Sequence, residues 1–211
     1  DKFNGVLVAR GDLGVEQSLA KVPVLQKNII EKCTKAKKPV IVATQILDSM
    51  VKNPSPTRAE VNDVANAVYD GVDAVMLSEE TAAGDYPIES VSIMSDIIND
   101  VENSMQVKID NVEKVKNDNR IAIGHSVRLI TQSMDIDGIV VMSESGSTAR
   151  IVSHFRPNVT IYGMSPHKYI CNRMALLWGV VPIQTKSFIS TDDMIVNAEK
   201  NGVQWAKKSD N

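Results

Sequence analysis

Three short apolar runs recur at a fixed interval in the first half of the chain. They occupy residues 6–9, 40–43 and 74–77, and each begins 34 residues after the one before. Runs of Val, Ile, Leu and Ala without polar alternation are typical of strands buried on both faces of a parallel sheet. The interval also suits helical repeats. Because each run is short and is followed by a helical pattern, we predict three βα units with right-handed crossovers.

The segments after these runs have helical spacing and recognisable ends. Pro23 suits the first position of one helix, residues 57–60 (TRAE) form a capping box that opens a second, and Pro87 opens a third. Gly71 can close the second helix. The faces expected to be buried are Val22, Leu25, Ile29 and Cys33 in the first helix, Val61, Val64, Ala65 and Val68 in the second, and Val91, Met94, Ile98, Val101 and Met105 in the third.

A polar stretch at residues 106–117 separates this half from a second α/β segment. We predict a domain at residues 1–105, a connection at 106–117 and a second domain at 118–211. In the second domain we expect strands near residues 138–142, 159–163 and 180–184, and helices near 119–134, 149–155, 168–178 and 191–207. The residues expected to face its core from the first and last helices are Ile123, Val127, Ile130, Met134, Met194, Ala198 and Trp205.

Composition and charge narrow the class of protein. The net charge is −3, so no basic field indicates nucleic acid or an anionic membrane as a partner. No apolar run approaches the roughly 20 residues of a membrane span. Cys33 and Cys171 stand far apart within apolar patterns, which does not suggest a disulfide framework or a metal site. We therefore expect a soluble, cytoplasmic protein.

Polar residues follow each of the first three predicted strands at its carboxyl end. These are Arg10-Gly11-Asp12, then Thr44-Gln45, then Ser78-Glu79-Glu80-Thr81. Parallel strands place these ends on one edge, where α/β proteins bind ligands. Asp12 is a hard oxygen ligand suited to Mg²⁺ or Mn²⁺. Gly11 would let a bound oxyanion approach the backbone, and Gly14 would let the chain turn.

Simpler interpretations of these residues remain open. Asp12 can be the capping residue of an ordinary strand-to-helix turn, and loops that follow strands are polar in any case. An Arg-Gly-Asp adhesion motif is a further alternative, although such a motif needs an exposed loop and this one ends an apolar strand.

Five motifs taken together resemble the pyruvate kinase family. They are VARGDLG at residues 8–14, ATQ at 43–45, NPSPTRAE at 53–60, DVANAV at 63–68 and LSEETA at 77–82, and the resemblance continues through ESGSTAR at 144–150. It implies that residues 1–105 are the last three βα units of a TIM (β/α)₈ barrel. Residues 118–211 would then be most of a three-layer α/β carboxyl-terminal regulatory domain.

The resemblance implies phosphoryl transfer from phosphoenolpyruvate to ADP, giving pyruvate and ATP, with Mg²⁺ or Mn²⁺ and often K⁺. Asp12 would be one of two carboxylates on the divalent ion. Arg10 and Thr44 would be the catalytic residues: the backbone around Arg10 and Gly11 would help to seat the substrate carboxylate, and Thr44 would place a hydroxyl beside the substrate. Ser78 would lie on the nucleotide side. Arg58 would support the active-site segment of a neighbouring subunit, in a homotetramer.

Some departures from the family pattern limit what this chain is expected to do. The family's catalytic lysine and its partner glutamate, the second metal carboxylate, belong to the strand before this sequence begins. We therefore expect the isolated chain to be inactive. Glu79 stands where many relatives have a small residue, and the carboxyl-terminal domain lacks its closing strands.

The loop at residues 143–148 suggests a rival function. Its hydroxyl residues, Ser143, Ser145, Ser147 and Thr148, precede or open a predicted helix, where N–H groups and hydroxyls together bind phosphate. An ordinary helix cap is the alternative. On the rival reading the chain is a non-catalytic module that binds a sugar phosphate. Glu144 would repel a second phosphate, so a sugar monophosphate or AMP is the expected effector.

Overall fold

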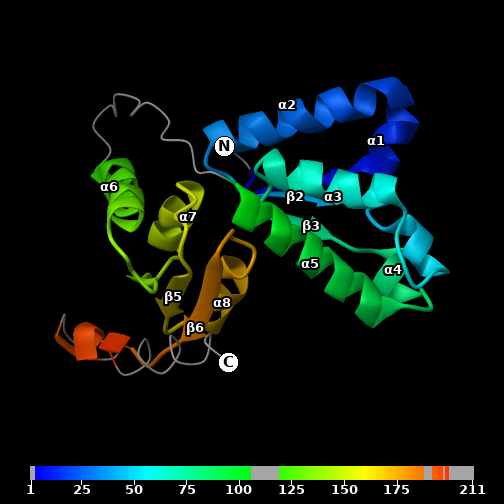
Figure 1. Ribbon diagram of the computed structural model, residues 1–211. Coiled ribbons are helices and arrows are strands. Elements are labelled where there is room, and N and C mark those ends of the chain that lie inside the picture. The colour runs from blue at the N-terminus through cyan, green and yellow to red at the C-terminus, as the bar shows by residue number, and fades with distance from the viewer. Residues whose placement is uncertain (1–2, 106–118, 188–191, 197, 200–211) are drawn as a thin grey trace. The chain divides into compact units, whose positions relative to one another are not determined.

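The computed structural model describes residues 3–105, 119–187, 192–196 and 198–199. The chain divides into two compact units, residues 1–107 and 108–211 (Figure 1). The predicted connection at 106–117 lies outside the described residues, and so does Trp205. Of the predicted last helix, residues 192–196 and 198–199 are helical.

The first unit is built from three βα units, as predicted. Its elements are β1 (Val6–Ala9), α1 (Arg10–Glu16), η1 (Leu19–Lys21), α2 (Val22–Lys35), β2 (Val40–Ala43), η2 (Asp48–Val51), α3 (Arg58–Tyr69), β3 (Ala74–Met76), α4 (Glu79–Ala82) and α5 (Pro87–Ser104). The strands form one parallel sheet in the order β1-β2-β3. The segments expected to be loops after β1 and β3 are instead helical, since α1 and α4 begin there.

The register of this sheet departs from the sequence repeat at the third strand. Val6 pairs with Val40, as the 34-residue interval predicts, but Ala74 pairs with Ile41 rather than with Val40. The interval could not define this register, because each run is apolar on both faces and a shift by one residue leaves it apolar.

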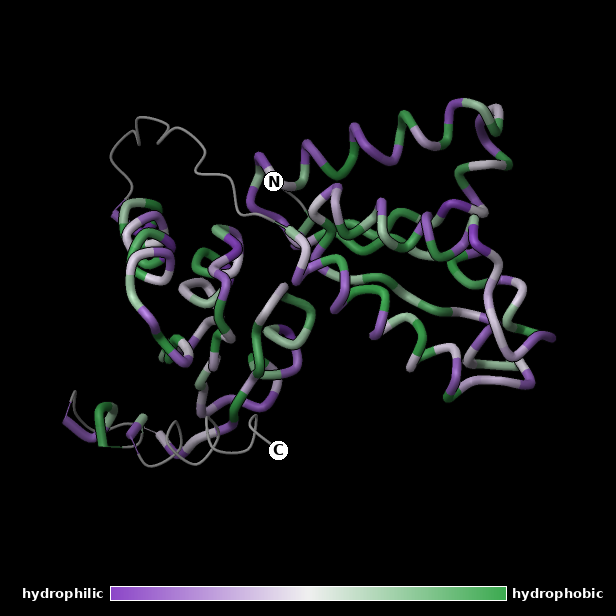
Figure 2. Tube along the Cα trace, in the orientation of Figure 1, coloured by the Kyte–Doolittle hydropathy of each residue, from purple (hydrophilic) through white to green (hydrophobic). Residues whose placement is uncertain are grey.

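The core of the first unit lies between the sheet and its helices. Val40, Val42 and Ala43 of β2 are fully buried. Around them pack Val8, Ile30, Cys33, Ile46, Leu47, Met50, Val64, Ala67, Val72 and Met94. Figure 2 shows α2 alternating between hydrophilic and hydrophobic residues, as a helix with one buried face does.

The predicted buried face of α5 is wrong at its two ends. Val91 and Met105 are exposed. Ser90 is fully buried instead, with its hydroxyl donating to the Tyr86 carbonyl, and Ile93 and Ile97 pack against the core. Because Ser90 faces inward, its neighbour Val91 is turned about 100° away from the core.

The second unit repeats the βα arrangement. Its elements are α6 (Asn119–Ser133), β4 (Ile139–Met142), α7 (Ser147–His154), β5 (Ile161–Ser165), α8 (Lys168–Met174) and β6 (Val180–Gln184). The sheet is parallel, in the order β4-β5-β6. Residues of α7 and α8, among them Ala149, Val152, Ile170 and Met174, form one core cluster with Val141, Ile161 and Val180 of the strands.

The predicted buried face of α6 is largely wrong, and one glycine explains why. Ile123, Ile130 and Met134 are exposed, whereas Gly124 and Thr131 are buried. A Cβ added at Gly124 would lie only 2.2 Å from the Phe155 ring. The closest contact of the helix is therefore made by its smallest residue, which a search for large apolar side chains overlooks.

Several element boundaries differ from the prediction. β5 begins and ends two residues later than predicted, α7 begins at Ser147 rather than near residue 149, and α8 ends at Met174 rather than near Trp178. None of the described helices is both long enough and apolar enough to span a membrane.

Candidate active site at the carboxyl ends of β1 to β3

The carboxyl ends of β1, β2 and β3 bring together the residues predicted to carry chemistry. Arg10, Gly11 and Asp12 form the first turn of α1, which starts directly after β1. Thr44 and Gln45 follow β2, and Ser78 directly precedes α4. The expected turn at Gly14 is wrong. This glycine lies inside α1 and is not among the described glycines with positive φ.

Thr44 and Gln45 adopt an unusual backbone conformation. Their φ angles are +69° and +52°, so two consecutive residues with side chains occupy the left-handed region. This region costs a non-glycine residue roughly 1–2 kcal/mol. Such residues persist only where surrounding contacts hold them, and they cluster at functional sites.

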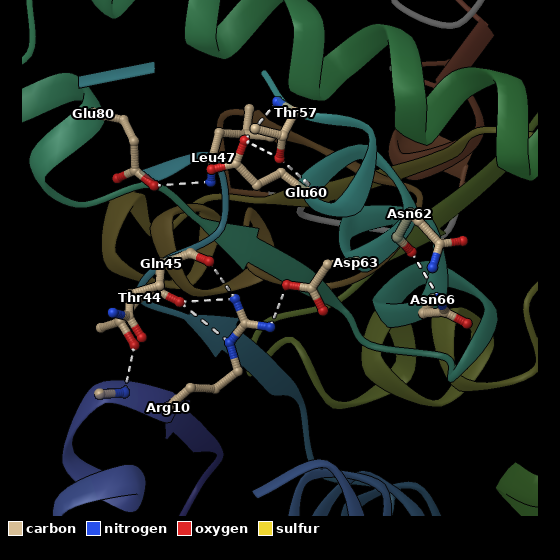
Figure 3. Close-up of polar contacts among 11 residues, drawn as sticks. Arg10, Thr44, Gln45, Leu47, Thr57, Glu60, Asn62, Asp63, Asn66 and Glu80 are labelled. Atoms are coloured by element: carbon tan, nitrogen blue, oxygen red, sulfur yellow. Dashed lines mark hydrogen bonds and ion pairs between the residues drawn. The ribbon is translucent and has the colours of Figure 1, made fainter. Parts of the chain in front are cut away.

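The side chain of Arg10 supplies those contacts (Figure 3). Its Nε and Nη2 donate to the Thr44 carbonyl at 3.2 and 2.9 Å, and Nη2 also donates to the Gln45 carbonyl at 2.8 Å. Nη1 forms an ion pair with the carboxylate of Asp63 in α3. The guanidinium is mostly buried, with 12% of the side chain exposed. Arg10 therefore acts on the backbone of the turn rather than projecting into solvent.

Thr44 is oriented by a second contact. The backbone N–H of Gly11 donates to Thr44 Oγ1 at 2.8 Å. Because Oγ1 accepts this bond, the hydroxyl can still donate its own proton. No residue in the described part of the chain accepts that proton, so it is available to a ligand at this edge.

Asp12 lies one residue beyond Gly11 and its side chain is exposed. It makes no hydrogen bond or ion pair with the residues that the structure describes, and these residues hold no group of three or more potential metal ligands. Mg²⁺ is commonly held by one or two protein carboxylates, with water and substrate phosphate oxygens completing its shell. A single free carboxylate at this edge fits that kind of site.

The residues after β3 play unequal parts. Glu79 is exposed. Glu80 was expected to face the ligand edge as a second acid, but it is buried, with 2% of its surface exposed. Its carboxylate accepts from the backbone N–H groups of Ser78 at 2.7 Å and Leu47 at 3.1 Å, and so ties the end of β3 to the loop after β2. Ser78 Oγ is buried and has no hydrogen-bond partner among the described residues.

The capping box that opens α3 is confirmed. Thr57 Oγ1 accepts from the Glu60 N–H, and the Glu60 carboxylate accepts from the Thr57 N–H. The carboxylate also accepts from the N–H and the hydroxyl of Ser49. Burial raises the pKa of Glu60, but these hydrogen bonds outweigh it and hold the pKa below its ordinary value. Arg58, in the same turn, is exposed.

Asp63 opens the DVANAV motif at residues 63–68, but the sequence did not reveal its role in the site. It lies on the polar side of an amphipathic helix, where a charged residue is ordinary, and nothing in the local pattern connects it to Arg10. Glu80 was noticed as an acid, but its burial and its two N–H partners depend on how the loops fold.

The loop before α7 lies in the second unit. Ser145 Oγ donates to Ser147 Oγ at 3.0 Å and accepts from the Ser147 N–H at 3.4 Å. Gly146 has a φ of +76°, Ser143 is buried, and Glu144 and Thr148 are exposed. The hydroxyls of Ser145 and Ser147 are therefore gathered at the start of the helix.

The fold and the site define a class: an α/β protein whose first unit is a run of βα units, with its polar residues collected at the carboxyl edge of the sheet. Residues 1–91 match the family model for the pyruvate kinase barrel domain, and residues 121–210 match that for the pyruvate kinase alpha/beta domain. The chain belongs to the pyruvate kinase family.

Individual relatives agree with this assignment. The pyruvate kinase of Staphylococcus haemolyticus is 46% identical over 207 residues, which are 97% of this chain and 35% of that protein. That of Clostridium acetobutylicum is 43% identical, over 91% of this chain and 41% of its own length. A crystal structure of a pyruvate kinase from Cryptosporidium parvum matches 98% of this chain and 42% of its own, with a TM-score of 0.89 and 37% identity. The chain thus spans between a third and a half of the length of these relatives.

Proposed function

We propose that the protein carrying this chain transfers a phosphoryl group from phosphoenolpyruvate to ADP, giving pyruvate and ATP in glycolysis. The observation that carries the proposal is the hydrogen bond between Gly11 N–H and Thr44 Oγ1. It joins the ends of β1 and β2 beside the exposed carboxylate of Asp12, so a hydroxyl and a free carboxylate border the same edge. The named relatives are all pyruvate kinases, which supports the same activity.

Each residue has a role within this proposal. Asp12 would hold Mg²⁺ or Mn²⁺, and the bound ion would supply neutralisation of phosphate and enolate charge. The Thr44 hydroxyl, whose own proton is uncommitted, would donate to the substrate. The backbone at Arg10 and Gly11 would face the substrate carboxylate, and Ser78, with its unpartnered hydroxyl, would lie on the nucleotide side.

Further parts of the proposal concern the whole protein. K⁺ would be an additional cofactor, bound by residues outside this chain. The protein would act in the cytoplasm as a homotetramer, in which the exposed Arg58 would contact a neighbouring subunit. These features rest on membership of the family.

The test is a steady-state assay of the full-length protein. With phosphoenolpyruvate, ADP, Mg²⁺ and K⁺, we expect pyruvate to form, and we expect EDTA to abolish its formation. Restoring Mg²⁺ or Mn²⁺ should recover the rate. A folded full-length protein that forms no pyruvate beside an active reference enzyme would contradict the proposal.

A phosphate-binding role for the loop at residues 143–148 is a second proposal, favoured by the Ser145–Ser147 hydrogen bond. Because Ser147 Oγ accepts from Ser145, the Ser147 hydroxyl keeps its own proton to donate to a phosphate group, and the helix N-terminus favours negative charge. Ser143 and Thr148 would complete the loop. The effector would be a sugar monophosphate or AMP. In the rival function, this binding would be the only activity of the chain.

A further inference from the structure

We infer that Asp63 is a positioning residue for the Thr44 hydroxyl, acting through the guanidinium of Arg10. The inference rests on the proposed function, because Thr44 is the group that Asp63 would serve. Asp63 itself lies on α3. Its contact is with Arg10 Nη1, and Arg10 in turn contacts the two carbonyls of the turn (Figure 3).

The charge of Asp63 stabilises the position of the Arg10 guanidinium against the turn after β2. The Arg10 side chain is 12% exposed, and a mostly buried cation needs an anionic partner. The only such partner in the described part of the chain is Asp63. The other acceptors of the Arg10 guanidinium, the carbonyls of Thr44 and Gln45, are neutral. Removing the charge of Asp63 would leave the guanidinium poorly compensated, and it would then move toward water.

The conformation of the turn makes this movement consequential. Thr44 and Gln45 are both held at positive φ, a conformation that is unfavourable for residues other than glycine. Without the Arg10 hydrogen bonds, the turn can relax toward negative φ, and Thr44 Oγ1 would leave the Gly11 N–H. A shift of about 1 Å in a reacting group can cost about 100-fold in rate.

A simpler role for the ion pair is to join α1 to α3 for stability alone. The chain offers a matched control for that role. Asp70, at the end of the same helix, pairs with Lys27 of α2, and neither side chain forms a hydrogen bond or ion pair with the turn after β2 in the described part of the chain. If the Arg10–Asp63 pair were merely structural, neutralising Asp63 or Asp70 would have similar consequences for turnover.

A double-mutant cycle on the full-length enzyme tests the inference. In the wild-type background, Asp63→Asn should lower kcat by about 10- to 100-fold and leave the KM for ADP nearly unchanged. In a Thr44→Ala background, the same substitution should lower kcat less than about twofold, because the group being positioned is already gone. Asp63→Glu, which keeps the charge, should recover part of the lost rate. Asp70→Asn should leave kcat unchanged.

The outcomes separate the inference from the proposed function. Normal kcat for Asp63→Asn, or an equal fall in both backgrounds, would overturn the role of Asp63 while leaving the activity of the enzyme intact. Unchanged kcat for Thr44→Ala would remove the proposed role of Thr44, and that of Asp63 with it. A fall in kcat for Asp70→Asn as large as that for Asp63→Asn would show that loss of any such ion pair is sufficient, which also overturns the inference.

Discussion

The backbone N–H of Gly11 donates a 2.8 Å hydrogen bond to Oγ1 of Thr44, although the two residues lie 33 positions apart. The bond connects the first turn of α1 with the left-handed turn after β2. Because both elements follow directly from paired strands, the parallel register of β1 and β2 sets the distance between them. The position of Thr44 Oγ1 is thus set by the protein itself, and the proposed phosphoryl transfer would depend on such preorganised groups.

Asp12 provides the first test of the site. In the full-length enzyme, Asp12→Ala should reduce kcat by at least about 100-fold, because the remaining carboxylate would hold the metal in poor geometry. Asp12→Asn should be nearly as damaging, since the amide keeps the shape and loses the charge. Turnover should be measured as a function of Mg²⁺ concentration. Near-normal kcat at saturating Mg²⁺ for either variant would exclude Asp12 from the metal site.

Gly11 distinguishes a ligand requirement from a folding requirement. A Cβ at this position would lie 3.6 Å from Thr44 Oγ1, an ordinary contact, so the protein itself does not demand glycine. We expect Gly11→Ala to leave the thermal midpoint unchanged or slightly higher, since alanine favours helix. The KM for phosphoenolpyruvate should rise about tenfold, because the methyl group would occupy the substrate's approach to the backbone.

The matched control for this prediction is Gly14→Ala, in the same helix. There the added Cβ would meet Leu19 Cδ2 at 3.1 Å, the end of a flexible side chain. This variant should leave the KM for phosphoenolpyruvate unchanged. Equal KM values for the two variants would argue against backbone contact with substrate at Gly11.

Glu60 predicts a pH dependence of stability. Its folded-state pKa is lowered by the hydrogen bonds from Ser49 and Thr57, although burial opposes them. A depressed pKa means that this stabilisation is fully present above the unfolded-state value, about 4.3, and is lost as the pH falls through the folded-state pKa. Glu60→Gln should cost roughly 1 kcal/mol at pH 7.

Thermal unfolding between pH 7 and pH 3 would measure this effect. The difference in midpoint between wild type and Glu60→Gln should be largest at neutral pH and should shrink below about pH 4. Glu16→Gln serves as the control, because Glu16 is exposed and makes no hydrogen bond or ion pair with the described residues. A difference that stays constant with pH would show that the Glu60 charge does not contribute.

The isolated chain should not turn over phosphoenolpyruvate. Its first sheet has three strands, and Leu7 of β1 and Met76 of β3 are 45% and 38% exposed, whereas a closed barrel would cover such edges. The resemblance also implies that the family's catalytic lysine is not among these residues. A coupled assay on the purified 211-residue chain should give only background. Steady pyruvate formation that scales with the chain's concentration would contradict this.

The local pattern predicted the elements of the site better than its contacts. The strand limits at residues 6–9 and 40–43 and the capping box of α3 follow from short-range rules, and the structure confirms them. No short-range rule predicts the left-handed conformation of Thr44 and Gln45, because neither residue is a glycine. This conformation depends on Arg10 and Asp63, which come from different elements.

The same limit explains the errors in packing. A pattern of large apolar residues selected Ile123 and Ile130 as the buried face of α6, but close approach to Phe155 selected Gly124. Likewise, Glu80 looked like an acid available to a ligand, and its burial follows from two N–H groups that the loops bring to it. These outcomes depend on shape and on distant partners rather than on spacing in the sequence.

The last prediction concerns the effector, and it depends on the charge of one side chain. Glu144 is exposed in the loop where Ser145 and Ser147 are gathered. Relatives that bind fructose 1,6-bisphosphate, as the resemblance implies, line this loop with hydroxyls and a basic residue. A carboxylate here repels a dianionic phosphate, and because Glu144 is exposed this repulsion is strongest at low ionic strength. We therefore expect the hydroxyls to bind one phosphate group and Glu144 to disfavour the binding of a second. Activation curves of the full-length enzyme should show no response to micromolar fructose 1,6-bisphosphate and a response to a sugar monophosphate or AMP.

Glu144→Lys should strengthen that response, most of all at low ionic strength, and Ser145→Ala should weaken it. Strong activation of the wild-type enzyme by the bisphosphate would overturn the prediction, and Glu144→Lys would then change little.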